Sequence, residues 1–243
     1  MAGAHKVAML VGAGDAIGAA VARRFAKEGY AVCISRREAA KSQGLVDELT
    51  SAGLEIHTFS VDARQESEVQ NLFAKVEKEI GPIEVCLFNA GSNVNKPLLE
   101  TTEKLFFKAW ELACYAGFLV GREATRYMLK RGRGTMLFTG ATASVRGGSG
   151  FSAFAGAKHA LRALAQSLAR ELGPKGVHVA HVVIDGAIDG AFIRGLLPDA
   201  AEKLGREEIL VPDEIAKNYV WLHRQSRSAW TFEMDLRPWA ETW

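Results

Sequence analysis

The chain of 243 residues has few cysteines, and none of them is placed to suggest a disulfide or a metal site. Cys33, Cys86 and Cys114 are odd in number and lack the paired spacing of metal ligands. Two of them stand inside apolar runs, where a free thiol usually behaves as a small core side chain. We therefore expect no disulfide framework and no metal, and we expect a reducing compartment.

An excess of charge of one sign is also missing. Thirty basic and 28 acidic residues give a formal charge of +2, with no long basic run, so binding to nucleic acid or to a membrane surface is not expected. No apolar run approaches the about 18 residues that span a membrane. Residues Met1 to His5 lack the basic-then-apolar pattern of a secretion signal. These absences predict a cytoplasmic protein.

What the sequence does contain is a regular alternation of short apolar segments with longer amphipathic ones. The composition, 48% hydrophobic and 24% charged, is that of a globular protein with a sizeable core. Strands are predicted over residues 6–11, 31–35, 55–61, 83–89, 135–139, 177–184 and 230–236. Helices are predicted over residues 17–28, 38–52, 67–80, 103–130, 151–172 and 212–222, with loop and short helix over 187–211.

Strands joined through helices pair in parallel, with right-handed crossovers. The alternation therefore predicts an α/β fold, a doubly wound, mostly parallel, seven-stranded Rossmann-like sheet. No linker or composition change interrupts the pattern, so residues 1–243 are expected to form a single domain.

A glycine-rich turn, Gly12-Ala13-Gly14-Asp15-Ala16-Ile17-Gly18, joins the first predicted strand to the first helix. Glycines let the backbone approach a pyrophosphate, and the free N–H groups and dipole of a helix N-terminus attract the anion. A tight turn without a ligand would have a similar sequence. Its position directly after the first strand favours the nucleotide site.

Three further features follow later strands, at the sheet edge where open α/β folds bind ligands. Asp62-Ala63 follows the third strand, Asn89-Ala90-Gly91 follows the fourth, and Lys158 lies on the helix after the fifth. Together with the glycine turn, this ordered set resembles the short-chain dehydrogenase/reductase family over essentially the whole chain.

The resemblance implies a nicotinamide dinucleotide, with its pyrophosphate on the glycine turn, its adenine near Asp62 and a ribose near Asn89-Ala90-Gly91. It also implies a homodimer or homotetramer with contacts through the helices holding residues 119–128 and 161–172, and a small-molecule substrate. The cofactor-binding residues that we expect are Gly12, Gly14, Ile17, Gly18, Arg36, Arg37, Asp62, Ala63, Asn89, Ala90, Gly91, Lys158, Gly186 and Ile188.

The end of the second strand bears on the choice of nucleotide. NAD-selective members of this fold place an acid there, which holds the ribose 2′-OH. This chain has Ser35 followed by Arg36 and Arg37, which suits a 2′-phosphate. Asp15 argues the other way, because a carboxylate repels phosphate. The sequence favours NADP, with NAD or an empty nucleotide site as alternatives.

The catalytic positions of the family are altered. In its Tyr-x-x-x-Lys motif the lysine is kept as Lys158, but the tyrosine is replaced by Phe154. The family's serine falls at Ala141, with Thr142 and Ser144 as the nearest hydroxyl groups, and its helix asparagine falls at Cys114. Losing a positioned acid–base group costs roughly 10²–10⁴ in rate. Ordinary carbonyl reduction is therefore expected to be slow.

Other side chains are candidates for the missing chemistry, each with a structural alternative. Lys158 either transfers a proton or only bonds the nicotinamide ribose. Asp185, at the end of the sixth strand, either takes part in catalysis or caps the turn at Gly186. Arg146 either binds an acidic substrate or is merely solvated. The candidate catalytic residues are Lys158, Thr142, Asp185 and the position of Phe154.

The leading interpretation is an oxidoreductase with altered acid–base residues that acts on a small or medium apolar molecule. The apolar segment containing Phe192, Ile193, Leu196 and Leu197 favours such a substrate. Because Phe154 and Ala141 lack hydroxyl groups, a cofactor-binding protein without turnover, a sensor or a partner subunit, remains the alternative. Non-redox chemistry on the same scaffold is a third possibility.

Overall fold

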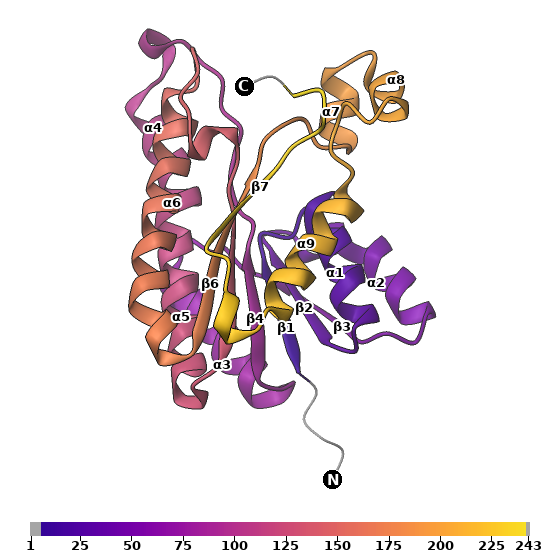
Figure 1. The fold of residues 1–243 in the computed structure, drawn as a ribbon, viewed down its shortest axis with the longest axis vertical. Coiled ribbons are helices and arrows are strands. Elements are labelled where there is room, and N and C mark those ends of the chain that lie inside the picture. The colour runs from indigo at the N-terminus through magenta and orange to yellow at the C-terminus, as the bar shows by residue number, and fades with distance from the viewer. Residues whose placement is uncertain (1–5, 242–243) are drawn as a thin grey trace.

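The structure, a computed structural model, describes residues 6–241 and contains one seven-stranded sheet between two layers of helices (Figure 1). Residues 1–5 and 242–243 lie outside the described part, and so does the expectation for Met1 to His5. The strands are β1 (Val7–Val11), β2 (Ala31–Arg36), β3 (Ile56–Ser60), β4 (Ile83–Phe88), β5 (Gly134–Thr139), β6 (Val177–Ile184) and β7 (Glu233–Leu236).

The sheet has the order β3-β2-β1-β4-β5-β6-β7, and every neighbouring pair in it is parallel. The predicted doubly wound α/β sheet is confirmed, and it is parallel throughout. The chain moves outward from β1 to β3 and then crosses back to β4, so a crevice forms where the direction of winding changes.

The two helical layers bury both faces of the sheet. One layer contains α1 (Ile17–Lys27), α2 (Gln43–Ser51) and α9 (Pro212–Arg224), and the other contains α3 (Glu66–Glu79), α5 (Ala116–Arg131) and α6 (Ser152–Leu172) (Figure 1). Val7 and Met9 pack under the second layer, whereas Ala8 and Leu10 pack under the first. Because both faces are covered, the central strands are continuous apolar runs.

The helix predicted over residues 103–130 is interrupted. It consists of α4 (Glu103–Trp110), a π-helical segment (Glu111–Tyr115) and α5. A π-helical turn contains one more residue than an α-helical turn, and such insertions occur most often at functional sites. The apolar pattern continues through Trp110 and Tyr115, so it does not reveal the insertion.

Two other elements differ from the prediction by more than two residues. Within the predicted helix over 38–52, a 3₁₀ turn (Ala39–Ser42) precedes α2. The segment 187–211 contains short helices, as predicted, namely α7 (Ala191–Leu196) and α8 (Ala200–Gly205). The last strand begins at Glu233 rather than at Trp230, because the indole of Trp230 stacks on the ring of His178 with 4.8 Å between centroids.

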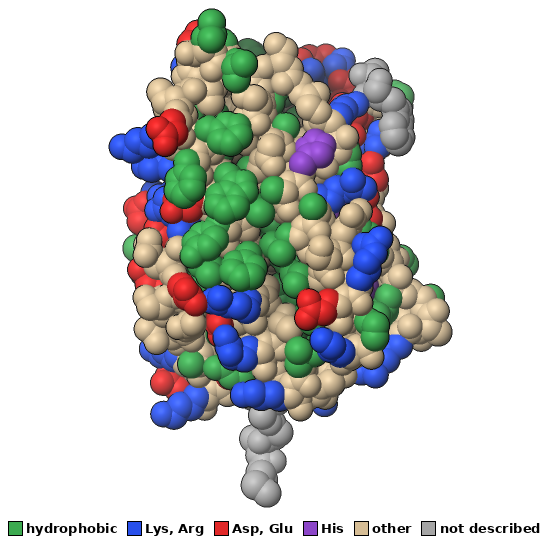
Figure 2. Space-filling model, turned by 90° about the vertical axis from the view of Figure 1, so that its left-hand side faces the viewer, with side chains coloured by type: hydrophobic (Ala, Val, Ile, Leu, Met, Phe, Trp, Pro, Cys, Tyr) green, Lys and Arg blue, Asp and Glu red, His purple; other side chains and the backbone are tan. Residues whose placement is uncertain are grey.

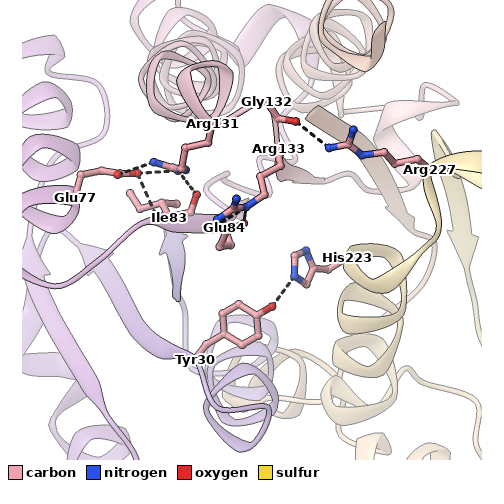
Figure 3. Close-up of polar contacts among 9 residues, drawn as sticks. All are labelled: Tyr30, Glu77, Ile83, Glu84, Arg131, Gly132, Arg133, His223 and Arg227. Atoms are coloured by element: carbon pink, nitrogen blue, oxygen red, sulfur yellow. Dashed lines mark hydrogen bonds and ion pairs between the residues drawn. The ribbon is translucent and has the colours of Figure 1, made fainter. Parts of the chain in front are cut away.

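Polar contacts close the amino ends of the strands, at the edge opposite the candidate site (Figure 3). Arg131 donates to both carboxylate oxygens of Glu77, at 2.8 and 3.0 Å, and to the carbonyl of Ile83 at 2.8 Å. The buried carboxylate of Glu84 accepts from Arg133 at 2.9 Å. These contacts tie α3, α5 and β4 together and leave the carboxyl edge of the sheet for ligands.

No helix within residues 6–241 combines the length and the apolar character needed to cross a membrane.

Candidate functional site

A cleft of about 380 Å³ lies at the carboxyl ends of β1, β2 and β4 and beside the segment that follows β3. It gathers residues that are far apart in the sequence. The predicted cofactor residues that line it are Gly12, Gly14, Arg36, Arg37, Asp62, Ala63, Asn89, Ala90 and Gly91. The structure therefore brings together most of the set that the sequence analysis assigned to the nucleotide.

The floor of this cleft is a close contact between two backbone turns. Gly12 has φ +78°, and a Cβ there would lie 2.7 Å from both the N and Cβ atoms of Ala90. The side-chain amide of Asn89 donates to the carbonyl oxygen of Gly12 at 3.2 Å. A Cβ at Gly18 would lie 2.6 Å from Cα of Ala13, so that glycine lets α1 pack against the turn. Both glycines are required by the geometry.

Charged side chains surround the cleft in pairs. Nη1 of Arg36 donates to Oδ1 of Asp15 at 2.7 Å, which links the two residues that the sequence analysis weighed against each other. Asp62 accepts from Nε of Arg64 at 2.9 Å, and this hydrogen bond holds the pKa of Asp62 below its ordinary value. Arg64 was missed by the sequence analysis, although it lies only two residues from Asp62.

One polar atom in the cleft wall has no protein partner. Ser35 is 1% exposed, and its Oγ forms no hydrogen bond among residues 6–241. Unsatisfied buried hydroxyl groups are uncommon in folded proteins, because burying one without a partner is costly. Ser35 lies at the strand end where the fold places a nucleotide ribose, so a bound ligand would supply the missing partner.

Two adjoining cavities, of about 480 and 290 Å³, lie beside the cleft and share Asn93, Thr142 and Phe154. The larger one is also lined by the predicted residues Ile17, Gly186 and Ile188. From the predicted apolar segment it contains Phe192 and Ile193, whereas Leu196 and Leu197 do not line it. Asn93 was not identified from the sequence, since an isolated asparagine in a loop has no distinguishing pattern.

Lys158 lies beside Gly91 of the cofactor cleft and also bonds Thr139 of the larger cavity. It lies one helical turn after Phe154 on α6, is 5% exposed, and donates from Nζ to the carbonyl oxygen of Thr139 at 2.9 Å. A Cβ at Gly91 would lie 3.2 Å from Nζ, so the ammonium group is beside the Asn-Ala-Gly turn. Burial lowers the pKa of Lys158 to about 8, which leaves it mostly protonated at neutral pH.

Asp185 is the centre of a polar cluster behind the cavities. It is 2% exposed, and its Oδ1 accepts from Oγ1 of Thr142 at 2.5 Å. Arg146 and Arg237 each place an Nη2 atom 3.4 Å from its carboxylate, and Arg146 also pairs with Glu241 at 3.3 Å. Arg146 is therefore not merely solvated. Asp185 therefore contacts three side chains, and one of them, Arg237, could not be identified from the sequence.

Three further side chains near the centre, those of Ser144, His159 and Cys114, have surroundings of their own. Ser144 is fully buried and accepts from the backbone N–H of Ala141 at 3.1 Å. The ring of His159 bonds the carbonyl oxygen of Ala155 on its own helix. Cys114 lies half-buried in the π-helical segment, where burial raises the pKa of its thiol. Residues 6–241 contain no group of three or more His, Cys, Asp or Glu side chains that could hold a metal ion.

The chain is similar to known proteins in sequence and in fold. The family model for short chain dehydrogenases matches residues 6–197. A short-chain dehydrogenase/reductase of Armillaria gallica is 32% identical over 178 residues, which cover 72% of this chain and 68% of that protein. The crystal structure of a short-chain dehydrogenase from Rhodopseudomonas palustris is 47% identical, with 96% of this chain and 99% of that one covered and a TM-score of 0.83.

An actinorhodin polyketide ketoreductase crystallised with NADPH is similar in fold, with a TM-score of 0.88 over 96% of both chains and 23% identity. The family match covers the glycine turn, the cofactor cleft, Phe154, Lys158 and the Thr142–Asp185 contact. The chain therefore belongs to the short-chain dehydrogenase family.

Proposed function

We propose that the protein is a nicotinamide-dependent oxidoreductase with altered acid–base residues that acts on a small or medium apolar substrate. The observation that carries the proposal is the cleft floor, where Gly12 packs against Ala90 so closely that there is no room for a Cβ atom at position 12. When bound, the nicotinamide would supply or accept a hydride. The chain's own residues bind it, orient it and surround the substrate.

The residues of the cleft fit the parts of such a cofactor. The turn from Gly12 to Gly18 would bind the pyrophosphate at the N-terminus of α1. Asp62 and Ala63 would border the adenine, and the unpartnered Oγ of Ser35 would meet the adenosine ribose. Lys158, with Asn89 to Gly91, would hold a ribose. Gly186 and Ile188 would border the nicotinamide in the larger cavity.

The basic residues after β2 support NADP as the preferred cofactor. We expect calorimetric titration to show tighter binding of NADPH than of NADH. The Arg36→Asp variant should bind NADPH about tenfold or more weakly, because a charge-assisted hydrogen bond to phosphate is lost, and its affinity for NADH should not change.

The Asp15→Asn variant should bind NADPH up to about fivefold more tightly, since Arg36 would lose its competing partner.

Two results would contradict this assignment. If neither nucleotide binds, the proposed function itself fails. If both bind equally well and the Arg36→Asp variant does not change the ratio, the protein is an oxidoreductase without the proposed preference for NADP.

The altered centre favours one alternative, a cofactor-binding protein without turnover. Phe154 cannot exchange a proton, and Ala141 has no hydroxyl group to orient a substrate oxygen. The two functions separate in one experiment, because the alternative predicts NADPH binding together with no oxidation of NADPH across a panel of ketones, quinones and aldehydes.

A homo-oligomer is also proposed, through the two expected helices, α5 and α6, together with α4, but not through their leucine side chains. Leu119, Met128, Leu161 and Leu172 are at most 1% exposed and pack in the core of the single chain. Figure 2 shows instead that hydrophobic side chains gather on the face that carries α4, α5 and α6. The large exposed side chains there include Phe106, Phe107 and Phe118.

Phe107 and Phe118 belong to a series of neighbouring aromatic rings along α4, the π-helical segment and α5. Successive centroids are separated by 6.0 Å for Phe107 and Trp110, 6.1 Å for Trp110 and Tyr115, and 6.4 Å for Tyr115 and Phe118. An exposed apolar patch of this kind is typical of an interaction surface. A second copy of the chain is the partner that the family resemblance favours.

Light scattering at micromolar concentration should give the mass of a dimer or tetramer for the wild-type protein. The Phe118→Asp variant should shift the mass to that of a monomer, because it places a charge within the apolar contact. Trp221→Asp is the matched control, since Trp221 is an exposed aromatic residue on α9, in the opposite helical layer. A monomeric wild-type protein would refute the oligomer.

A further inference from the structure

The hydroxyl group of Thr142 is held in one orientation by a buried carboxylate. Its Oγ1 lies 2.5 Å from Oδ1 of Asp185, which is 2% exposed and also faces Arg146 and Arg237. An ionised carboxylate accepts hydrogen bonds and has no proton to donate, whereas a hydroxyl group has one proton and two lone pairs. Thr142 therefore donates its only proton to Asp185.

A hydroxyl group whose proton is used in this way offers a ligand only its lone pairs. Thr142 is partly exposed and lines both cavities beside Phe154. The phenyl ring of Phe154 contributes neither donor nor acceptor to the same wall. The ammonium group of Lys158 lines neither cavity and donates to the carbonyl oxygen of Thr139. At this point the wall accepts hydrogen bonds and does not donate them.

Of the other polar side chains that line these cavities, Asp15, Asn89 and Thr139 are already hydrogen-bonded to Arg36, Gly12 and Tyr219. The remaining two, Arg146 and Asn93, do not change this conclusion. The guanidinium group of Arg146 faces the carboxylates of Asp185 and Glu241. Arg146 lines the smaller cavity and not the larger one. The amide of Asn93 lines both cavities, but an amide can donate or accept according to its rotation. Asn93 therefore accommodates either kind of ligand and selects neither.

We propose that Thr142, oriented by Asp185, selects a ligand whose polar group is a hydrogen-bond donor, namely an alcohol, over the corresponding ketone. The proposal rests on the proposed function, since alcohol and ketone are the two compounds that such an oxidoreductase interconverts. Thr142 contacts the ligand and determines the preference. Asp185 is a positioning residue that acts through the direction of the Thr142 hydroxyl.

The preference follows from the pairing of donors and acceptors. An alcohol can donate its proton to Oγ1 of Thr142, whereas a ketone oxygen would face the lone pairs of Oγ1 without a hydrogen bond between them. Leaving a buried polar pair unsatisfied costs about as much as the hydrogen bond itself or more. The affinity of the alcohol should therefore exceed that of a ketone of the same shape by about tenfold.

The test compares the binding of 1-tetralol and 1-tetralone, which share one apolar ring skeleton, by NMR titration of the full chain without added nucleotide. The wild-type protein should bind the alcohol about tenfold more tightly. Thr142→Val should bring the ratio close to one, whereas Thr142→Ser should keep it. Asn93→Ala is the control within the same cavities and should leave the ratio in favour of the alcohol.

Asp185→Asn tests the positioning role separately. The asparagine amide can donate to Oγ1 of Thr142, and the hydroxyl proton is then free to turn toward the ligand. The ratio should fall to about one or favour the ketone, a change that a merely destabilised protein would not produce. If Asp185→Asn does not fold, the near-isosteric Thr142→Val and Thr142→Ser pair still decides the matter.

Three results would overturn the inference: equal binding of the two compounds by the wild-type protein, an unchanged ratio in Thr142→Val, or no binding of either compound at millimolar concentration. These failures are distinct from failure of the proposed function. Loss of nucleotide binding would refute the oxidoreductase while the ratio persists. Nucleotide binding with no preference for the alcohol would refute this inference alone.

Discussion

The double variant Phe154→Tyr with Ala141→Ser is expected to reduce simple ketones about 10²–10⁴ times faster than the wild-type protein. Phe154 and Ala141 line the same 480 Å³ cavity, and Lys158 follows Phe154 by one turn of α6. A phenol at position 154 would place a proton donor on that wall, and a hydroxyl group at 141 would orient the substrate oxygen. The rate of NADPH oxidation with a panel of ketones, quinones and aldehydes measures the effect.

The rate increases of the two single variants, multiplied together, should be smaller than the rate increase of the double variant. Groups that act as a unit in catalysis are strongly non-additive, because a proton donor without a positioned substrate accomplishes little. The helix asparagine of the family is also missing, since Cys114 occupies that position. The double variant should therefore exceed the product of the two single effects and still remain below an ordinary rate of about 1–10³ s⁻¹.

Phe151→Tyr is the control for this prediction. Its ring centroid lies 6.4 Å from that of Phe154, and it lines only the smaller cavity. A phenol there adds a hydroxyl group to the region without placing it one turn before Lys158. If the wild-type protein already reduces ketones at an ordinary rate, the missing phenol is irrelevant and this interpretation of the centre is wrong.

The doubly wound, parallel character of the sheet could be predicted because it follows from local pattern. Buried strands such as Val7–Val11 are continuous apolar runs, and helices between them require parallel pairing. The break in the helix over 103–130 could not be predicted, since a π-helical insertion leaves the apolar pattern unchanged. Periodicity also identifies the apolar face of α6 without saying whether the core of the same chain or a second chain covers it.

The cofactor cleft was more predictable than the altered centre for a physical reason. Gly12, Asp62 and Asn89 each lie within two residues of a strand end, so the fold fixes their positions at one edge of the sheet. Asp185 and Thr142 are 43 residues apart, and their contact arises only because β5 and β6 are neighbours in the sheet. The hydrogen-bond partners of a buried carboxylate depend on such packing between distant segments, which the sequence pattern does not reveal.

The Gly12→Ala variant is expected to lose about a hundredfold in NADPH affinity, an effect comparable with two charge-assisted hydrogen bonds. Its new Cβ would lie 2.7 Å from both N and Cβ of Ala90, so one of the two turns must move away from the cleft floor. The positive φ of +78° adds a conformational cost of roughly 1–2 kcal/mol in stability.

Gly29→Ala separates the two causes. Gly29 has nearly the same backbone angle, φ +82°, but a Cβ there meets no atom within 4 Å, and it lies after α1, outside the lining of the cleft. This control should lose roughly 1–2 kcal/mol in urea denaturation and keep its affinity for NADPH. Gly12→Ala should lose both stability and affinity, with calorimetry reporting the affinity. A Gly12→Ala protein that binds NADPH as tightly as the wild-type protein would show that the cofactor does not lie against the contact between Gly12 and Ala90.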